Sequence, residues 1–350
     1  MKQPFTIDLG YLHALRALRE HGTITAAAAA LHLTPSAVSQ QLHVLSRSVG
    51  VPLLVRHGRL VRLTPQALVL LEHAEILHAQ LERTRADLAG QADGQVGRLM
   101  IGAFATAISG VVAPALAELS AVRPRLEVMV QEMQAPECFT RLDSGELDLA
   151  ITVEWRDAPH RGDPRYARRD LLRDPLDVAL PATHPLARRS MVRLDDLAAQ
   201  PWIAGAPGSP CAEVALAACA TAGFNPRVRH VTEDWNAVIA LVRAGAGVAL
   251  IPRLALPTRP EGIVIRTLGQ NGPARRIFAA VRAGSERSAL IAPTLAALAD
   301  IAGRKRPAGP APPTPKGRRS RQLVTASAAA LLPARDEGRP ACLRRPSAHH

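Results

Sequence analysis

Polar side chains with helical spacing near the N-terminus could contact nucleic acid. They form one face of a predicted helix, and they are Ser36, Ser39, Gln40, His43 and Arg47. The opposite face of that helix is apolar and would pack inward, with Val38, Leu42, Leu45 and Val49. Glutamine can pair with an adenine edge, and serine and arginine can bind phosphates or bases, so the polar face suits a DNA major groove. An ordinary solvated helix face has the same polarity, and the neighbouring elements must decide between the two.

A second group of polar residues lies where predicted strands end or predicted helices begin. Its members are Thr106, Ser109, Glu132, Ser209 and Asp234, and Trp155 is a further candidate. Hydroxyls and free backbone N–H groups at helix starts suit a carboxylate or another anion. The same residue types are also ordinary helix caps, so this pattern alone leaves both interpretations open.

Nucleophiles and metal ligands do not form a recognisable catalytic set. Cys138, Cys211, Cys219 and Cys342 contain no CxxC pair, which argues against a zinc site or a disulfide scaffold. The chain has no HExxH, GxSxG or P-loop motif. Cys211 lies at a predicted helix start, where the pKa of a thiol can fall, and Cys219 lies too far along that helix to pair with it. We therefore predict no metal, no cofactor and no enzymatic activity.

Three short helices are predicted to position the polar face. The first contains Leu12 to His21, the second runs from Ile24 to about Leu31, and the third runs from Pro35 to about Val49. Thr23 and Thr34 have the positions of N-caps, and glycines follow the first and third helices. A tight turn before the third helix completes a helix-turn-helix pattern.

A predicted hairpin and a long helix follow. Residues 52–64 contain two apolar runs around His57 and Gly58, with Arg56, Arg59 and Arg62 placed to contact the DNA backbone or the minor groove. The next helix is predicted over 65–89. Its apolar stripe contains Ala67, Leu70, Leu71, Ala74, Leu77, Leu81 and Leu88. Pairing with a second copy of the chain would cover this stripe, in particular Leu70, Leu77 and Leu81, although folding back on the same chain is an alternative.

Alternating strands and helices follow a hinge-like segment at 90–97 and predict a parallel sheet with helices on its faces. We expect two lobes within 98–302. The first contains about 98–173 and 269–302, and the second contains about 174–268. The fold class is therefore α/β, with an N-terminal winged helix-turn-helix over 1–64. A ligand cleft is expected between the lobes.

Charge is concentrated at the two ends of the chain. The net charge is +13, and residues 1–66 carry seven basic and two acidic side chains. Residues 303–350 carry eleven basic and two acidic side chains and are rich in proline, so we expect a disordered basic tail. The remainder is nearly neutral. No apolar segment is expected to span a membrane, which predicts a cytoplasmic protein.

The N-terminal segment resembles the LysR-type transcriptional regulators, a family of bacterial DNA-binding proteins. The matching residues are Thr23-Ile24, Ala27-Ala28, Leu31, the run TPSAVSQQL from Thr34, Leu45, Gly50, Pro52 to Leu54, Arg56 and Leu63-Thr64. Ser46, Ile24, Leu54 and Ala67 depart from the residues usual in the family. The resemblance implies dimerisation through the linker helix. It also implies an effector domain similar to type 2 periplasmic binding proteins.

The resulting hypothesis is a dimeric or tetrameric sequence-specific regulator of transcription, controlled by a small-molecule effector bound between the lobes. Its expected partners are double-stranded DNA, an effector, further copies of itself and RNA polymerase, with no membrane. Two alternatives come from other classes of protein. One is a nucleoid-like protein that binds DNA without sequence preference, and the other is a small-molecule binding protein without a regulatory DNA site.

Overall fold

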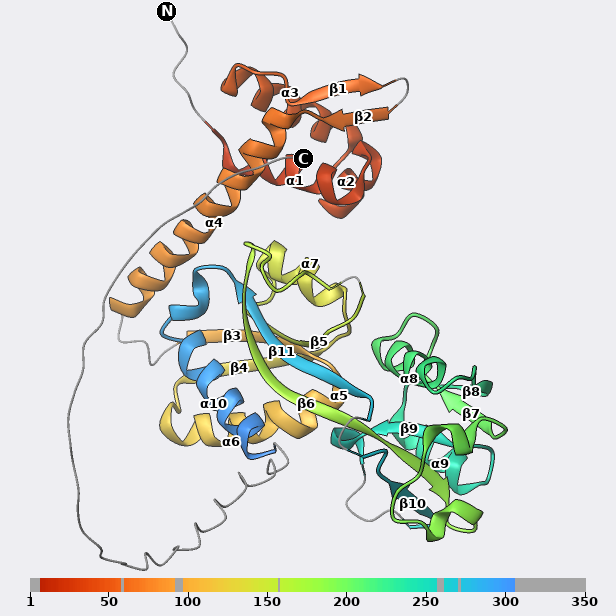
Figure 1. The fold of residues 1–350 in the computed structure, drawn as a ribbon. Coiled ribbons are helices and arrows are strands. Elements are labelled where there is room, and N and C mark those ends of the chain that lie inside the picture. The colour runs from red at the N-terminus through yellow and green to blue at the C-terminus, as the bar shows by residue number, and fades with distance from the viewer. Residues whose placement is uncertain are drawn as a thin grey trace, which may run out of the picture. The chain divides into compact units, whose positions relative to one another are not determined.

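The computed structural model describes residues 7–57, 60–91, 97–156, 158–256, 261–269 and 272–305. Its N-terminal part consists of α1 (Leu9–His21), α2 (Ile24–Ala30), α3 (Pro35–Val49), β1 (Leu54–His57) and β2 (Leu60–Leu63). β1 and β2 pair antiparallel, with Leu54 opposite Leu63. This arrangement is a winged helix-turn-helix, as the sequence predicted (Figure 1). We call residues 7–63 the head.

Local capping fixes the ends of the head helices. The Thr23 hydroxyl accepts a hydrogen bond from the Ala26 N–H at 3.1 Å, and the Thr34 hydroxyl accepts one from the Ala37 N–H at 3.2 Å. Each cap pairs a backbone donor that the helix leaves unsatisfied. Gly50 ends α3 in the left-handed region, with φ of 74°, where glycine has no Cβ to clash. The predicted bounds of α3 therefore hold at both ends.

The long helix α4 (Pro65–Gln91) begins in the core of the head and then leaves it. Ala67, Leu71 and Ala74 are buried with Leu12, Leu15 and Leu42 of the head. Leu77, Leu81 and Leu88 are exposed, with 46%, 43% and 67% of their surface accessible. The predicted stripe is thus divided: its first turns complete the core of the head, and its later leucines are exposed, although Leu81 also lines a pocket against lobe I.

A mixed sheet forms the centre of the remaining chain. Its strands pair in the order β10 (Ile263–Arg266), β6 (Tyr166–Pro181), β11 (Ala274–Arg282), β5 (Leu149–Val153), β3 (Gly97–Ala103) and β4 (Leu126–Glu132). β4, β3 and β5 are parallel, as predicted. β11 is antiparallel to both β5 and β6, because the chain returns to the sheet from the second lobe. The sheet is consequently mixed rather than wholly parallel.

Helices cover both faces of the sheet in lobe I. The continuous helix of α5 (Ala105–Ala107), a π-helical turn (Ile108–Val112) and α6 (Ala113–Val122) lies on one face together with α10 (Ile291–Arg304). α7 (Glu137–Ser144) covers the other face. β5 shows why two covers are needed: Ile151 packs on the first side and Ala150 on the second, since neighbouring residues of a strand point to opposite faces.

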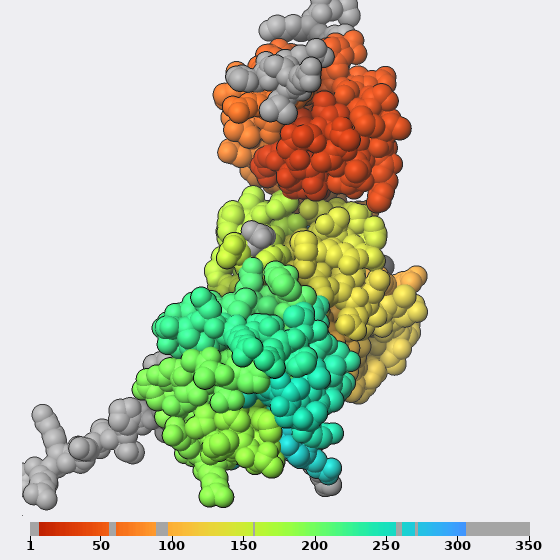
Figure 2. All heavy atoms as spheres, turned by 90° about the vertical axis from the view of Figure 1, so that its right-hand side faces the viewer, coloured from red at the N-terminus to blue at the C-terminus, as the bar shows by residue number. Residues whose placement is uncertain are grey.

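Lobe II is built around the C-terminal half of β6. It contains β7 (Pro201–Ala204), α8 (Pro210–Thr221), β8 (Arg227–Val231), α9 (Trp235–Arg243), β9 (Ala249–Pro252) and the 3-10 turn η4 (Arg253–Ala255). β9 and β10 pair with β6, and β7 pairs with β8 in parallel. These elements, green to cyan, face the viewer in Figure 2.

The strand β6 is longer than predicted. Its sequence predicts a strand only at Leu176 to Leu180, whereas the strand extends over Tyr166–Pro181 and runs through both lobes. The N-terminal half of β6 contains Arg168, Arg169, Asp170 and Arg173, and these charged residues interrupt the apolar pattern from which a buried strand is predicted. Pairing with β11 stabilises that half, and this long-range contact leaves no local sequence pattern.

The helix over Ala105–Val122 is long and apolar enough to cross a membrane by length and composition, contrary to the expectation of no such segment. It is also a core helix. Val111, Val112 and Ala115 are fully buried against the sheet of lobe I. A buried core helix passes the same test, so the segment is weak evidence for a membrane span.

Candidate functional site

The polar face of α3 is exposed along its whole length. Ser36, Ser39, Gln40, His43 and Arg47 are all exposed, and Val38, Leu42 and Leu45 on the other side are buried. Thr34 and Pro35, which begin this helix, are exposed as well. The Thr34 hydroxyl lies 3.0 Å from that of Ser36 and also caps the helix, so both hydroxyls have partners in the free protein. The side chains of Gln40 and Ser39 make no hydrogen bond among the described residues.

The hairpin of β1 and β2 contains two of the three predicted arginines among the described residues. Arg62 is exposed on β2, and Val61 on the same strand packs against the core of the head. Arg56 belongs to β1, opposite Val61 in the hairpin. Arg59 lies outside the described residues. The head therefore presents a polar helix face and a basic hairpin.

A cleft of about 830 Å³ lies between the two lobes. The structure brings all five predicted residues to it: Thr106, Ser109, Glu132, Ser209 and Asp234. Lobe I contributes the first three and lobe II the last two. Ser209 and Asp234 cap α8 and α9, with their side chains accepting hydrogen bonds from the N–H groups of Ala212 and Asn236. Trp155 packs against Phe139, with ring centroids 5.8 Å apart, and does not line this cleft.

A buried ion pair that was not predicted from the sequence also borders the cleft. Nε of Arg275 donates to Oδ2 of Asp174 at 2.8 Å, and the two side chains are 3% and 1% exposed. Nη2 of Arg275 donates to the Thr106 hydroxyl at 2.6 Å, and Nη1 contacts Sγ of Cys211 at 3.4 Å. A sequence signal existed: Arg275 precedes the apolar strand residues 277–281, where an arginine needs a buried partner.

Asp174 is also the point where strands of the two lobes meet. It lies on β6, and its Oδ1 accepts a hydrogen bond from the Leu254 N–H at 3.1 Å. Burial raises the pKa of the Asp174 carboxyl, and Arg275 with neighbouring backbone N–H groups offsets part of that effect. The pair thus contacts residues of both lobes next to the cleft.

The pKa of the Cys211 thiol is not lowered, although a helix start can lower the pKa of a thiol. Burial raises the pKa of the Cys211 thiol, and the nearby Arg275 only partly opposes that effect. Burial likewise raises the pKa of Cys219 to about 11. Cys138, Cys211 and Cys219 are all free thiols. Within the described chain, no group of histidine, cysteine or acidic side chains is arranged to hold a metal ion.

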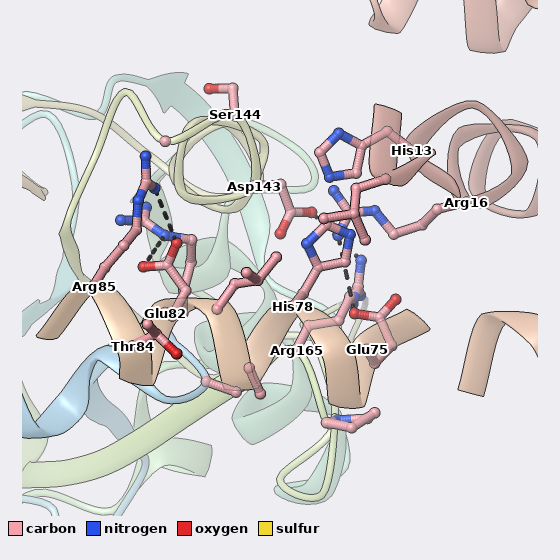
Figure 3. A pocket seen from close by; sticks show the side chains of 17 residues that line it. His13, Arg16, Glu75, His78, Glu82, Thr84, Arg85, Asp143, Ser144 and Arg165 are labelled. Carbon is pink, nitrogen blue, oxygen red and sulfur yellow. Dashed lines mark hydrogen bonds and ion pairs between the residues drawn. The ribbon is translucent and has the colours of Figure 1, made fainter. Parts of the chain in front are cut away.

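A second pocket of about 470 Å³ lies where α1 and α4 meet lobe I (Figure 3). His13 of α1 stacks on His78 of α4, with ring centroids 4.7 Å apart. Nη1 of Arg16 lies 4.0 Å from Oε2 of Glu75, and Oε1 of Glu75 is buried without a partner among the described residues. Burial raises the pKa of Glu75 and lowers that of His78, while the pKa of His13 falls to about 4.

Lobe I contacts α1 and α4 directly at this junction. Arg165, at the edge of lobe I, pairs with Glu20 of α1 and with Asp163 at 2.8 Å. Arg282 pairs with Glu82 of α4 at 3.3 Å. Gly284 has φ of 94°, and a Cβ there would clash with the Ala79 carbonyl of α4, so glycine permits the close approach.

A winged helix-turn-helix joined to a two-lobed α/β domain with a cleft is the architecture of a protein that binds DNA and a ligand, and the comparisons with known proteins decide its class. Two family models match the chain. The model of the bacterial regulatory helix-turn-helix protein, lysR family, covers residues 9–68, and that of the LysR substrate binding domain covers residues 92–302. The chain belongs to the LysR family, and it is a sequence-specific DNA-binding transcriptional regulator with an effector-binding domain.

Known relatives agree with this assignment. The regulator MetR of Salmonella typhimurium is 30% identical over 286 residues, which covers 81% of this chain and 87% of MetR. A hydrogen peroxide-inducible genes activator of Pectobacterium carotovorum is 28% identical over 280 residues, covering 79% and 90%. The structure of full-length CbnR with its target DNA has a TM-score of 0.51 and 23% identity, and it covers 85% of this chain and all of CbnR. This last likeness concerns the fold.

Replacing Asp174 by asparagine should destabilise the protein by about 3 kcal/mol, because the Arg275 guanidinium would stay buried without a counter-charge. Urea denaturation measures the change. Asp195→Asn in lobe II is the control, since its pair with Arg193 is exposed to solvent and should contribute little to stability. Equal losses in the two variants would contradict a special role for the buried pair.

His13→Gln should reduce the loss of thermal stability on acidification. The folded protein lowers the pKa of His13 from 6.5 to about 4, through burial and the nearby Arg16. The unfolded chain therefore takes up this proton first, and stability falls as the pH drops from about 6.5 towards 4. Melting curves across that range should be flatter for His13→Gln than for the exposed control His43→Gln. If the melting temperatures of the two variants change in parallel with pH, the pKa of His13 is not lowered by burial in the folded protein.

Proposed function

We propose that the exposed face of α3 reads the operator sequence. The observation that carries this proposal is the division of the helix into two faces: a buried apolar side fixes its orientation, and the polar side makes few internal contacts. Gln40 supplies the amide for an adenine edge, and Arg47 and His43 can bind guanine or phosphate. Thr34, Pro35, Ser36 and Ser39 lie at the same end as Gln40, the end that enters the groove in helix-turn-helix proteins.

The wing arginines Arg56, Arg59 and Arg62 would bind the DNA backbone or the minor groove. Contacts to phosphates position a protein on DNA without reading its sequence. Full-length CbnR has been solved in complex with its target DNA, which supports the same use of the head here. RNA polymerase is a further partner that a transcription regulator of this kind would contact.

Dimerisation through α4 would bring two heads to two half-sites. Leu77 and Leu81 are exposed, and Leu70 is half-buried at the edge of the head core. An apolar groove of about 500 Å³ adjoins this region, lined by Val51, Leu53, Val69 and Leu70 among others. A second copy of the chain would cover these surfaces as a dimer, and two dimers could form a tetramer.

The cleft between the lobes would hold the effector. Thr106, Ser109, Ser209, Glu132 and Asp234 come from both lobes, so a ligand that contacts all of them would bridge the lobes. Such a ligand biases the regulator only through its different affinity for the two arrangements. We assign the DNA-binding domain to 1–64, the linker to 65–89, the hinge to 90–97, the effector domain to 98–302 and a basic tail to 303–350.

A regulator of this kind acts on the chromosome, so we assign it to the cytoplasm. Its relatives are transcriptional regulators, and we propose no catalytic step and no cofactor for it. A nucleoid-like protein that binds DNA without sequence preference would not need an amide such as that of Gln40 on its reading face. A small-molecule binding protein without an operator would not need one either.

Gln40→Ala should lower discrimination between the operator and random DNA by roughly tenfold to a hundredfold, since a good bidentate base contact contributes about 1–3 kcal/mol of selectivity. Fluorescence anisotropy with DNA from upstream of the protein's own gene, at two salt concentrations, measures it. Gln131→Ala, at an exposed position of β4 in lobe I, should leave discrimination unchanged. If Gln40→Ala also leaves it unchanged, another face of the head reads the DNA.

The double substitution Leu77→Glu and Leu81→Glu should shift the protein to a monomer, because burying two carboxylates in an apolar interface is strongly unfavourable. Sedimentation velocity gives the oligomeric state. Met191→Glu, at an apolar position of lobe II that is 55% exposed, serves as the control and should retain the oligomer. An unchanged oligomer in the double variant would place the interface elsewhere.

A further inference from the structure

The charges that line the cleft between the lobes are mostly negative. Among the described residues that line it, Glu132, Glu233 and Asp234 carry carboxylates and Arg275 carries the one guanidinium. Glu132 ends β4 in lobe I, and the other two lie at the start of α9 in lobe II. The acidic groups therefore face the cleft from both walls.

Arg275 has little capacity left for an anionic ligand, because its side chain is buried and only two of its five N–H groups lack a partner among the described residues. All three of its nitrogens have partners: Asp174 at 2.8 Å, Thr106 at 2.6 Å and Cys211 at 3.4 Å. Its face lies over the Phe104 ring, 4.8 Å from the centroid, and the side chain is 3% exposed. Its charge is neutralised by Asp174 below the cleft floor, so the pair adds no net charge to the lining.

The three carboxylates are accessible and largely unused. All three residues are exposed. Within the described chain, the side chains of Glu132 and Glu233 make no hydrogen bond or ion pair. Asp234 uses Oδ1 to cap α9 at the Asn236 N–H, 2.8 Å away, and its second oxygen stays available. The caps at Ser209 and Asp234 each accept from one of the helix N–H groups that were expected to attract an anion.

We propose that the effector of this regulator carries a positive charge, as an ammonium or guanidinium group, and that this group binds between Glu132 of lobe I and Glu233 of lobe II. The inference rests on the proposed function of the cleft as the effector site. Like charges on the two walls repel, and a cation between them removes that repulsion and favours a closed arrangement of the lobes. Trp235 also lines the cleft, and an aromatic ring can contribute to the binding of a cation.

Binding to the full-length protein tests the charge of the ligand. The probes are L-lysine, agmatine and putrescine as cations, and succinate and benzoate as anions, each at millimolar concentration and matched ionic strength. Isothermal calorimetry should detect binding of at least one cationic probe and none of the anionic ones. Binding of an anionic probe, or failure of all the cationic ones, would overturn the proposal.

Neutral variants test the two residues. Glu132→Gln and Glu233→Gln should each lower the affinity for the cationic probe at least about tenfold, because each removes the charge of one wall and keeps the size of the side chain. Glu127→Gln is the matched control, since it lies exposed on the same strand as Glu132 and outside the cleft lining. Unchanged affinity in both cleft variants would place the cation elsewhere and refute the assignment.

The same samples separate this inference from the proposed function. Operator binding is measured by anisotropy with and without each probe. If the protein discriminates operator DNA from random DNA and its DNA binding responds to an anionic probe, the proposed function stands and the proposal of a cationic effector is wrong. A protein that binds no specific DNA loses the proposed function, whatever its cleft binds.

Discussion

The buried pair of Arg275 and Asp174 is the interaction on which the arrangement of the two lobes depends. Asp174 lies on β6 and Arg275 on β11, the two strands that connect the lobes. Thr106 of lobe I and Cys211 of lobe II both contact the same guanidinium. A charge pair with almost no exposure is stable only when its geometry is complete. The pair consequently ties both lobes together beside the cleft.

The head presents a polar helix face to a partner. It does so with short-range devices: hydroxyl caps, a proline in the first turn of α3 and glycine ends. The core beneath contains small and medium apolar residues, among them Ala27, Val38 and Leu45. Because the buried side of α3 is fixed by this packing, the exposed side is positioned without any internal contact of its own.

The junction of α1, α4 and lobe I links these two parts within one chain. Its contacts are charged and half-buried, with Arg165 reaching Glu20 and Arg282 reaching Glu82. Groups in such surroundings have shifted pKa values in both directions, which makes the junction sensitive to the protonation of His13 and Glu75. The cleft and the reading face are therefore joined by a polar contact rather than by an apolar core.

The sequence by itself determined the head, the helix α4 and the alternation of strands and helices, because caps, helical periods and apolar runs are local signals. It also placed Thr106, Ser209 and Asp234 at helix starts that do meet in one cleft. Only the tertiary structure decided what pairs across the chain: the length of β6, the antiparallel strand β11 and the partner of Arg275, 101 residues away. The charge of the cleft also came from the tertiary structure, since a side chain's availability depends on contacts that no local pattern records.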